Sequence, residues 1–366
     1  MEAAVANAIE PGDIMLVGVN GLWGERVGDL ASRYGAVVRY INVPAGGVFT
    51  LAQIEAGLDA NKGAKVLFLT HGESSTGTLQ PIDGVGAACA KRGVLFMLDT
   101  VCTLGGVPLH LDASGVDITY SGSQKCLGAP PGAAPFSMSP RARAKLAARK
   151  TPVASYYFDA NLVGLNWGCV PGYGYRGFAC ALTQAPYSLR YCSVDGKPRW
   201  YHHTSMINTV YALREALAML AEEGIEEMWA RHAAAAAQLH AGLERMGLTL
   251  FVKDPAARLP TVTTVEVPAG VVWTDVTTYM MRKYNLEISG GLGPTVGKVF
   301  RIGISASQTK IACCNPKQRE PEAACACCAH ALTRAPRRSG PQRAAGQCGA
   351  CACGCVRCAM RVDAQR

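Results

Sequence analysis

A lysine that follows a buried strand is the residue with the strongest chemical signal. Lys125 closes the run Tyr120-Ser121-Gly122-Ser123-Gln124-Lys125, which places its amine beyond a predicted strand and a Ser-Gly-Ser turn. In doubly wound α/β folds, ligands bind along the carboxyl edge of the sheet. A lysine that is partly desolvated there can lose its proton and form a Schiff base with an aldehyde. The alternative for this hexapeptide is a solvated loop lysine.

An aspartate that ends a second hydrophobic strand is the natural companion of this lysine. Asp99 closes the run Leu95-Phe96-Met97-Leu98-Asp99. A carboxylate at a buried strand end needs a cation or several donors to offset its desolvation. A protonated pyridine nitrogen would be such a cation, and the pairing would let that ring accept electrons. The alternative is an N-cap for the helix that follows.

Two further segments carry small polar or flat side chains after predicted strands. The run Thr70-His71-Gly72-Glu73-Ser74-Ser75-Thr76-Gly77 can donate to ligand oxygens, but it lacks the closing glycine of a serine-hydrolase elbow. Trp23 lies in Asn20-Gly21-Leu22-Trp23-Gly24, where flanking glycines allow a flat ring to approach closely. The alternative for a single tryptophan is core packing.

Alternating strands and helices must position these residues. Apolar, often β-branched runs bounded by turn residues predict buried parallel strands. Helical stretches between them indicate an α/β domain with helices on both faces of a mostly parallel sheet. The predicted strands are Ile14–Val19, Val37–Val43, Lys65–Thr70, Val94–Leu98 and Asp117–Tyr120, and the predicted helices are Gly24–Tyr34, Leu51–Asn61 and Gly84–Arg92.

A second, smaller α+β domain follows a long helical stretch. Residues 205–247 predict two or three helices with a break near Glu223-Gly224. Strands are expected at Leu248–Val252, Thr261–Val267 and Lys298–Ile302, with a helix near Thr274–Tyr284. The predicted organisation is a large domain over residues 1–223, a small domain over 224–304 and a tail over 305–366. An aperiodic stretch over 170–193 is interpreted as an insertion in the large domain.

Composition separates the tail from the rest of the chain. The 366 residues are 49% hydrophobic and 17% charged, so a sizeable core can form. The formal net charge is +9, but residues 305–366 hold eight Arg and two Lys against three acidic residues, which leaves +2 for the body. This distribution argues against nucleic-acid and membrane partners. Ten of the sixteen cysteines also lie in this tail, which is too poor in apolar residues to fold alone and is predicted to be disordered.

Several ordered motifs together resemble one family. Besides the two runs that contain Ser74 and Lys125, they are Tyr201-His202-His203-Thr204, Phe251-Val252-Lys253-Asp254-Pro255 and Gly290-Gly291-Leu292-Gly293-Pro294. The chain resembles the alanine–glyoxylate (serine–pyruvate) aminotransferase family of class-V pyridoxal-phosphate enzymes, from about residue 2 to 169 and from 194 to 304. The resemblance implies fold type I, the aspartate-aminotransferase-like α/β fold. Members of that family carry a phosphate-binding loop N-terminal to the matching region, and we expect this chain to begin after it.

The resemblance also implies roles for individual residues with pyridoxal 5'-phosphate as cofactor. Lys125 would form the aldimine and shuttle protons, and Asp99 would pair with the pyridine nitrogen. The ring would lie between Trp23 and Val101, while Ser74 and Gln124 would bond the cofactor. Arg301 would bind the substrate carboxylate with its guanidinium fork. Tyr201 and Thr204 would reach the phosphate of the neighbouring subunit's cofactor, which implies a homodimer. No metal ion is implied.

The function implied is transamination of glyoxylate to glycine, with alanine or serine as amino donor and ping-pong kinetics. A related alternative is a cysteine desulfurase, although Cys89, Cys102 and Cys126 lie in no obvious flexible loop. A different alternative is a non-catalytic aminotransferase-like chain whose Cys348-x-x-Cys351 and Cys355-x-x-Cys358 spacings bind zinc or copper(I). The family leads us to expect a peroxisomal location, with the mitochondrion or cytosol as alternatives.

Overall fold

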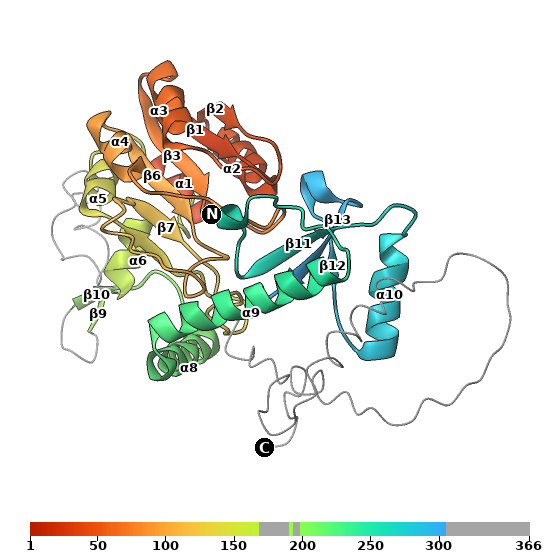
Figure 1. Ribbon diagram of the computed structural model, residues 1–366. Coiled ribbons are helices and arrows are strands. Elements are labelled where there is room, and N and C mark those ends of the chain that lie inside the picture. The colour runs from red at the N-terminus through yellow and green to blue at the C-terminus, as the bar shows by residue number, and fades with distance from the viewer. Residues whose placement is uncertain (168–189, 193–197, 305–366) are drawn as a thin grey trace, which may run out of the picture.

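Six strands form the sheet that carries the candidate site. The computed structural model describes residues 1–167, 190–192 and 198–304 (Figure 1). The strand order is β2-β1-β3-β6-β7-β8, in which the first five strands are parallel and β8 runs antiparallel to β7. The strands are β1 (Ile14–Val19), β2 (Val37–Asn42), β3 (Ala64–Thr70), β6 (Leu95–Asp99), β7 (Ile118–Tyr120) and β8 (Phe136–Met138). All five strands predicted here are confirmed, with ends that differ by at most one residue.

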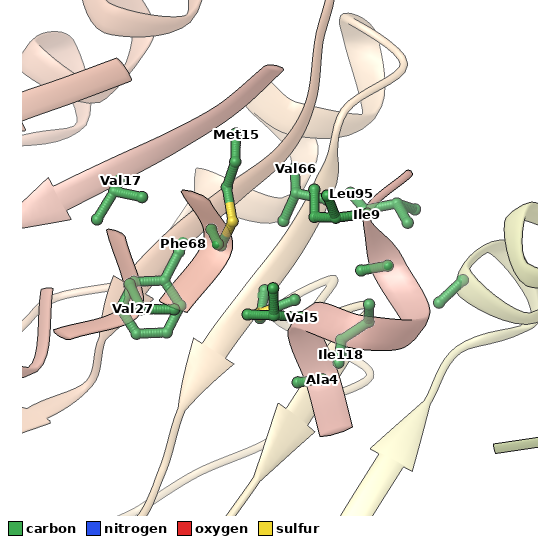
Figure 2. Close-up of a cluster of buried hydrophobic side chains, with 14 of the residues drawn as sticks. Ala4, Val5, Ile9, Met15, Val17, Val27, Val66, Phe68, Leu95 and Ile118 are labelled. Carbon is green, nitrogen blue, oxygen red and sulfur yellow. The ribbon is translucent and has the colours of Figure 1, made fainter. Parts of the chain in front are cut away.

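Helices cover both faces of this sheet. On one face, α1 (Glu2–Ala8), α2 (Leu22–Arg33) and α5 (Pro140–Ala147) enclose a buried cluster in which Val5 and Val27 meet Phe68 of β3 (Figure 2). On the other face, α3 (Leu51–Ala60) and α4 (Val85–Lys91) pack through Ile54, Leu58 and Val85. Two-sided burial explains why β3 and β6 are apolar along nearly their whole length. The predicted α/β class is confirmed.

Two short antiparallel pairs lie outside the main sheet. The strands β4 (Gly72–Glu73) and β5 (Thr78–Leu79) form a hairpin directly after β3. The strands β9 (Arg190–Cys192) and β10 (Pro198–Trp200) pair beside α6 (Ala160–Trp167). Most of the predicted insertion, and the predicted tail with its Cys-x-x-Cys spacings, lie outside the described residues.

Two long helices lead into the second sheet. α8 (Ile207–Glu223) ends at Gly224, whose φ of 90° requires glycine, and α9 (Ile225–Arg245) then extends toward the small sheet (Figure 1). The predicted break near Glu223-Gly224 is therefore confirmed. The small sheet has the order β11-β13-β12, and α9 and α10 pack on it through Leu243, Met280 and Phe300. Its elements are β11 (Val262–Glu266), α10 (Trp273–Tyr284), β12 (Ser289–Gly290) and β13 (Val299–Gly303), with 3₁₀ turns η2 (Pro255–Ala257) and η3 (Gly293–Thr295).

One predicted strand is wrong. Residues 248–252 form a single isolated bridge, between Leu250 and Val265, rather than a ladder. Phe251 N–H and Glu266 N–H do make backbone bonds across this bridge. The chain then turns at once, because Asp254 caps η2, which begins at Pro255. No helix in the described part of the chain is both long and apolar enough to cross a bilayer.

Candidate active site

The carboxyl ends of three neighbouring strands bring the site together. Thr70 at the end of β3 pairs with Asp99 at the end of β6, and Asp99 pairs with Tyr120 at the end of β7. Because parallel strands end at one edge of the sheet, the segments that follow them lie side by side. The predicted strands that end near Thr70, Asp99 and Tyr120 therefore end next to one another.

Lys125 lies in a loop whose two ends are joined by the β7–β8 pair. Inside the loop, Ser123 N–H donates to the Ala133 carbonyl at 3.0 Å and Ser123 Oγ donates to the Pro130 carbonyl at 2.6 Å. These bonds fix the backbone just before Lys125. The Lys125 side chain is half-buried and lines a cavity of about 160 Å³.

Asp99 is buried and bound by two donors. Tyr120 Oη donates to Oδ2 at 2.7 Å, and the Val101 amide donates to Oδ1 at 2.9 Å. Desolvation raises the pKa of Asp99, whereas these two donors and the nearby Lys125 amine act in the opposite direction. The N-terminal amine also lowers this pKa, and a further cation placed against the carboxylate would relieve its desolvation.

Trp23 lies in the first turn of α2 and contacts the β4–β5 hairpin. Its indole Nε1 donates to Ser74 Oγ at 2.9 Å, while its backbone N–H donates to Glu73 Oε2 at 3.1 Å. Arg26 lies over the indole, 4.5 Å from the ring centroid. The structure thus joins two predicted site residues, Trp23 and Ser74, that are 51 positions apart in sequence.

Arg301 reaches the same cavity from the small sheet. It lies on β13, and its side chain lines the cavity with Lys125 and Ser74. Arg301 Nε donates to the Gly290 carbonyl at 2.7 Å and Nη1 donates to the Ser74 carbonyl at 3.3 Å. Burial lowers the pKa of the guanidinium from its ordinary value, but the group stays cationic because that value is so high. An amine and a guanidinium therefore face one small space.

Four other predicted residues lie differently. The Val101 amide donates to Asp99 Oδ1, and the half-buried Val101 side chain packs at the edge of the core. Gln124 is exposed beside Lys125. Tyr201 and Thr204 are also exposed, and their hydroxyl groups lie 3.0 Å apart. None of these four side chains lines the cavity that holds Lys125 and Arg301, and neither do those of Asp99 and Trp23.

Several residues of the site were not assigned roles from sequence, among them Tyr120, Cys102 and Glu73. Tyr120 donates a hydrogen bond to Asp99. Its position at the end of the strand paired with β6 could have indicated this role, had the pairing of the two strands been predicted. Cys102 lines the cavity, and it follows Asp99 closely in sequence. Glu73 is fully buried, and desolvation raises its pKa to about 7. No sequence signal connects Glu73 with the start of α2. Among the described residues, no group of three or more His, Cys, Asp or Glu side chains could hold a metal ion.

Comparison with protein families gives a match over most of the chain. The family model described as aminotransferase class-V matches residues 1–151 and 181–310. The interval between the two matched parts covers α6 and the first half of the predicted insertion.

Individual relatives and solved structures agree with this match. An alanine–glyoxylate aminotransferase of Callithrix jacchus is 48% identical over 304 residues, which cover 83% of this chain and 67% of the relative. An (S)-ureidoglycine–glyoxylate transaminase of Bacillus subtilis is 34% identical, over 83% of this chain and 70% of the relative. The crystal structure of an alanine–glyoxylate aminotransferase from Nostoc sp. is 44% identical with a TM-score of 0.74, over 84% of this chain and 74% of that chain.

Proposed function

Since the chain belongs to the class-V aminotransferase family, we propose that it transfers an amino group from alanine or serine to glyoxylate, with glycine as product. Aminotransferase activity and pyridoxal 5'-phosphate as cofactor follow from family membership. The choice of glyoxylate is supported by the names of the similar proteins, which include alanine–glyoxylate and ureidoglycine–glyoxylate enzymes.

The residues at the sheet edge fit this cofactor. Asp99 is a desolvated carboxylate, and a protonated ring nitrogen would provide the cation that it needs. The Trp23 indole lies near the same edge, with Arg26 over one of its faces, and Lys125 offers the amine that would hold the cofactor. When bound, pyridoxal phosphate supplies an aldehyde that takes up the amino group and a ring that accepts an electron pair.

The chain's own side chains would orient the substrate and move its proton. Arg301 would bind the substrate carboxylate, because its contacts with Gly290 and Ser74 fix the guanidinium plane while other N–H groups remain for a planar anion. Lys125 Nζ would accept the proton that leaves the substrate carbon and would release it again within the same half-reaction.

The shared cavity is the observation that carries the proposal. Lys125 and Arg301 line one space of about 160 Å³, so an amine that could hold the cofactor and a cation that could bind a carboxylate lie together. Cys102 and Cys126 line it too, but burial raises their pKa values to about 11 and about 12. Such thiols stay protonated and are poor nucleophiles, which favours transamination over cysteine desulfuration.

The test combines covalent trapping with product analysis. We expect borohydride to fix pyridoxal phosphate on Lys125 in the parent chain and to fix none in Lys125→Ala. Lys91→Ala, a change of an exposed helical lysine, serves as the matched control and should label like the parent. Glycine formed from glyoxylate is then measured with alanine and with serine as donors. Cofactor trapped at another lysine in Lys125→Ala, or no glycine from either donor, would contradict the proposal.

We also propose that the protein acts as a homodimer. The helix α8 has no buried residue, and Ile207 and Tyr211 are 57% and 68% exposed. Tyr201 and Thr204 are exposed and do not line the cavity of their own chain. The family resemblance implies that they serve the site of the other subunit.

Mixed dimers test this arrangement. Neither Lys125→Ala nor Tyr201→Phe alone should give full activity, but a mixed dimer of the two would contain one site with both native side chains. Recovery of activity on mixing is expected if Tyr201 acts across the interface. No recovery in dimers shown to be mixed would place Tyr201 in its own subunit's site.

A further inference from the structure

The start of α2 receives its caps from another segment of the chain. Gly21 is the N-cap residue and has no side chain to cap the helix. Instead, the Leu22 amide donates to Ser75 Oγ at 3.0 Å and the Trp23 amide donates to Glu73 Oε2 at 3.1 Å. These two bonds satisfy amides that a helix leaves without partners in its first turn. Hairpin residues 73 and 75 thus do what an N-cap side chain ordinarily does.

Glu73 is held so that its carboxylate faces this helix start. The side chain is fully buried, and Oε1 accepts bonds from the Ser75 amide at 2.9 Å and from Ser75 Oγ at 2.7 Å. The contact with α2 is close, since a Cβ atom at Gly21 would lie 2.5 Å from Glu73 Cδ. Gly21 therefore lets the hairpin approach the helix.

The same hairpin is held on its other side by the small sheet and its turns. The carbonyl oxygens of residues 74 to 76 each accept a bond from a side chain of that region. The donors are Arg301 Nη1 at 3.3 Å, Thr295 Oγ1 at 2.7 Å and Thr264 Oγ1 at 2.7 Å. The hairpin is thus a fixed support against which α2 is placed.

From these contacts we propose that Glu73 is a positioning residue for the cofactor. With Ser75 it caps α2 and fixes the backbone of Trp23, while Ser74 Oγ accepts from the indole and fixes its rotation. The inference rests on the proposed stacking of Trp23 on the cofactor ring. Glu73 acts through Trp23 and does not line the cavity.

A double-mutant cycle tests whether Glu73 acts through Trp23. Loss of the buried hydrogen bonds of Glu73 should weaken cofactor binding by about tenfold in Glu73→Ala of the full chain. In a Trp23→Ala background, the same change should cost less than about twofold, because coupled residues are not additive. Glu73→Gln, which keeps an acceptor and nearly the same volume, should recover most of the affinity. Equal losses in both backgrounds would overturn the proposal.

Gln80→Ala is the matched control. Gln80 is also buried and bonds the Phe49 backbone at both N–H and carbonyl, and its side-chain hydrogen bonds go to residues 49 and 81 rather than to α2. Its effect on cofactor binding should be the same with and without Trp23. If Trp23→Ala alone leaves cofactor affinity unchanged, the proposed stacking of Trp23 is wrong. Equal losses from Glu73→Ala with and without Trp23 would instead show that Glu73 does not act through Trp23.

Hydrogen exchange gives a second measurement that needs no cofactor. In Glu73→Ala the Trp23 amide, and in the milder Ser75→Ala the Leu22 amide, should exchange faster than in the parent by about tenfold. Amides in the middle of α2 should be unaffected. Unchanged exchange at both amides in both folded variants would show that residues 73 and 75 do not cap the helix.

Discussion

Tyr120→Phe removes the hydroxyl group that holds Asp99 while leaving the ring in place. The bond from Tyr120 Oη to Asp99 Oδ2 is 2.7 Å long, and both residues are buried. A hydrogen bond to a charged group contributes about 1.5–3 kcal/mol, so we expect the cofactor-free protein to lose about 2 kcal/mol of unfolding free energy near neutral pH. Water cannot replace the lost donor at a buried site.

The pH dependence of this loss follows from the ionisation of Asp99. Burial raises the pKa of Asp99, and the Tyr120 donor counteracts this rise. Its removal should raise the pKa further, so the loss should be full where Asp99 is ionised and shrink as pH falls and the carboxyl protonates. Cofactor should restore part of the stability, since its ring nitrogen would supply a positive charge.

Chemical denaturation of four chains measures the effect: the parent, Tyr120→Phe, Asp99→Asn and the double variant. A neutral partner makes a weaker bond, so Tyr120→Phe should cost only about 1 kcal/mol in the Asp99→Asn background. The same cost in both backgrounds, or a loss that grows as pH falls, would refute the reasoning.

Three further perturbations have defined outcomes. Glu73 has its pKa raised to about 7 from an ordinary 4.5, so the stability of the parent relative to Glu73→Gln should fall by about 3 kcal/mol as pH rises from 4.5 through 7. A stability difference between the parent and Glu73→Gln that stays constant across this pH range would contradict the prediction. Gly77→Ala should destabilise the protein more than Gly93→Ala in thermal denaturation. Both glycines have positive φ, but a Cβ at Gly77 would lie 2.6 Å from Thr264 Oγ1, whereas nothing lies within 4 Å at Gly93. Arg301→Lys should raise the KM for the amino donor by about tenfold or more, because a point charge cannot replace the planar fork. An unchanged KM in steady-state assays would remove Arg301 from substrate binding.

The sequence allowed a correct prediction where an apolar pattern identified a strand and the strand direction placed its last residue. The strands that end near Thr70, Asp99 and Tyr120 were recognisable from buried apolar runs, and parallel strands bring their ends to one edge. The resemblance to class-V aminotransferases then pointed to Arg301, and the structure places it with Lys125 in one cavity.

The remaining features depend on contacts that no local pattern encodes. The cap on α2 comes from Glu73 and Ser75, some fifty positions along the chain, and a buried glutamate looks like a surface residue in sequence. The run 248–252 has strand composition, but its tertiary surroundings allow only one bridge with β11. The short β8 strand has too little periodicity to reveal its antiparallel direction.

The hairpin's bonds to the small sheet have a consequence for the order of folding. Asp99 and Tyr120 are 21 positions apart, whereas the bonds from Thr264, Thr295 and Arg301 to residues 74–76 span 188, 220 and 227 positions. Closing the longer loops costs more entropy and requires nearly the whole matched region to have been synthesised. Pulsed hydrogen exchange during refolding should therefore show protection around β6 and β7 before protection in β13. The pyridine-binding half of the site would assemble while the chain is growing, and the ability to recognise an acid would arise last.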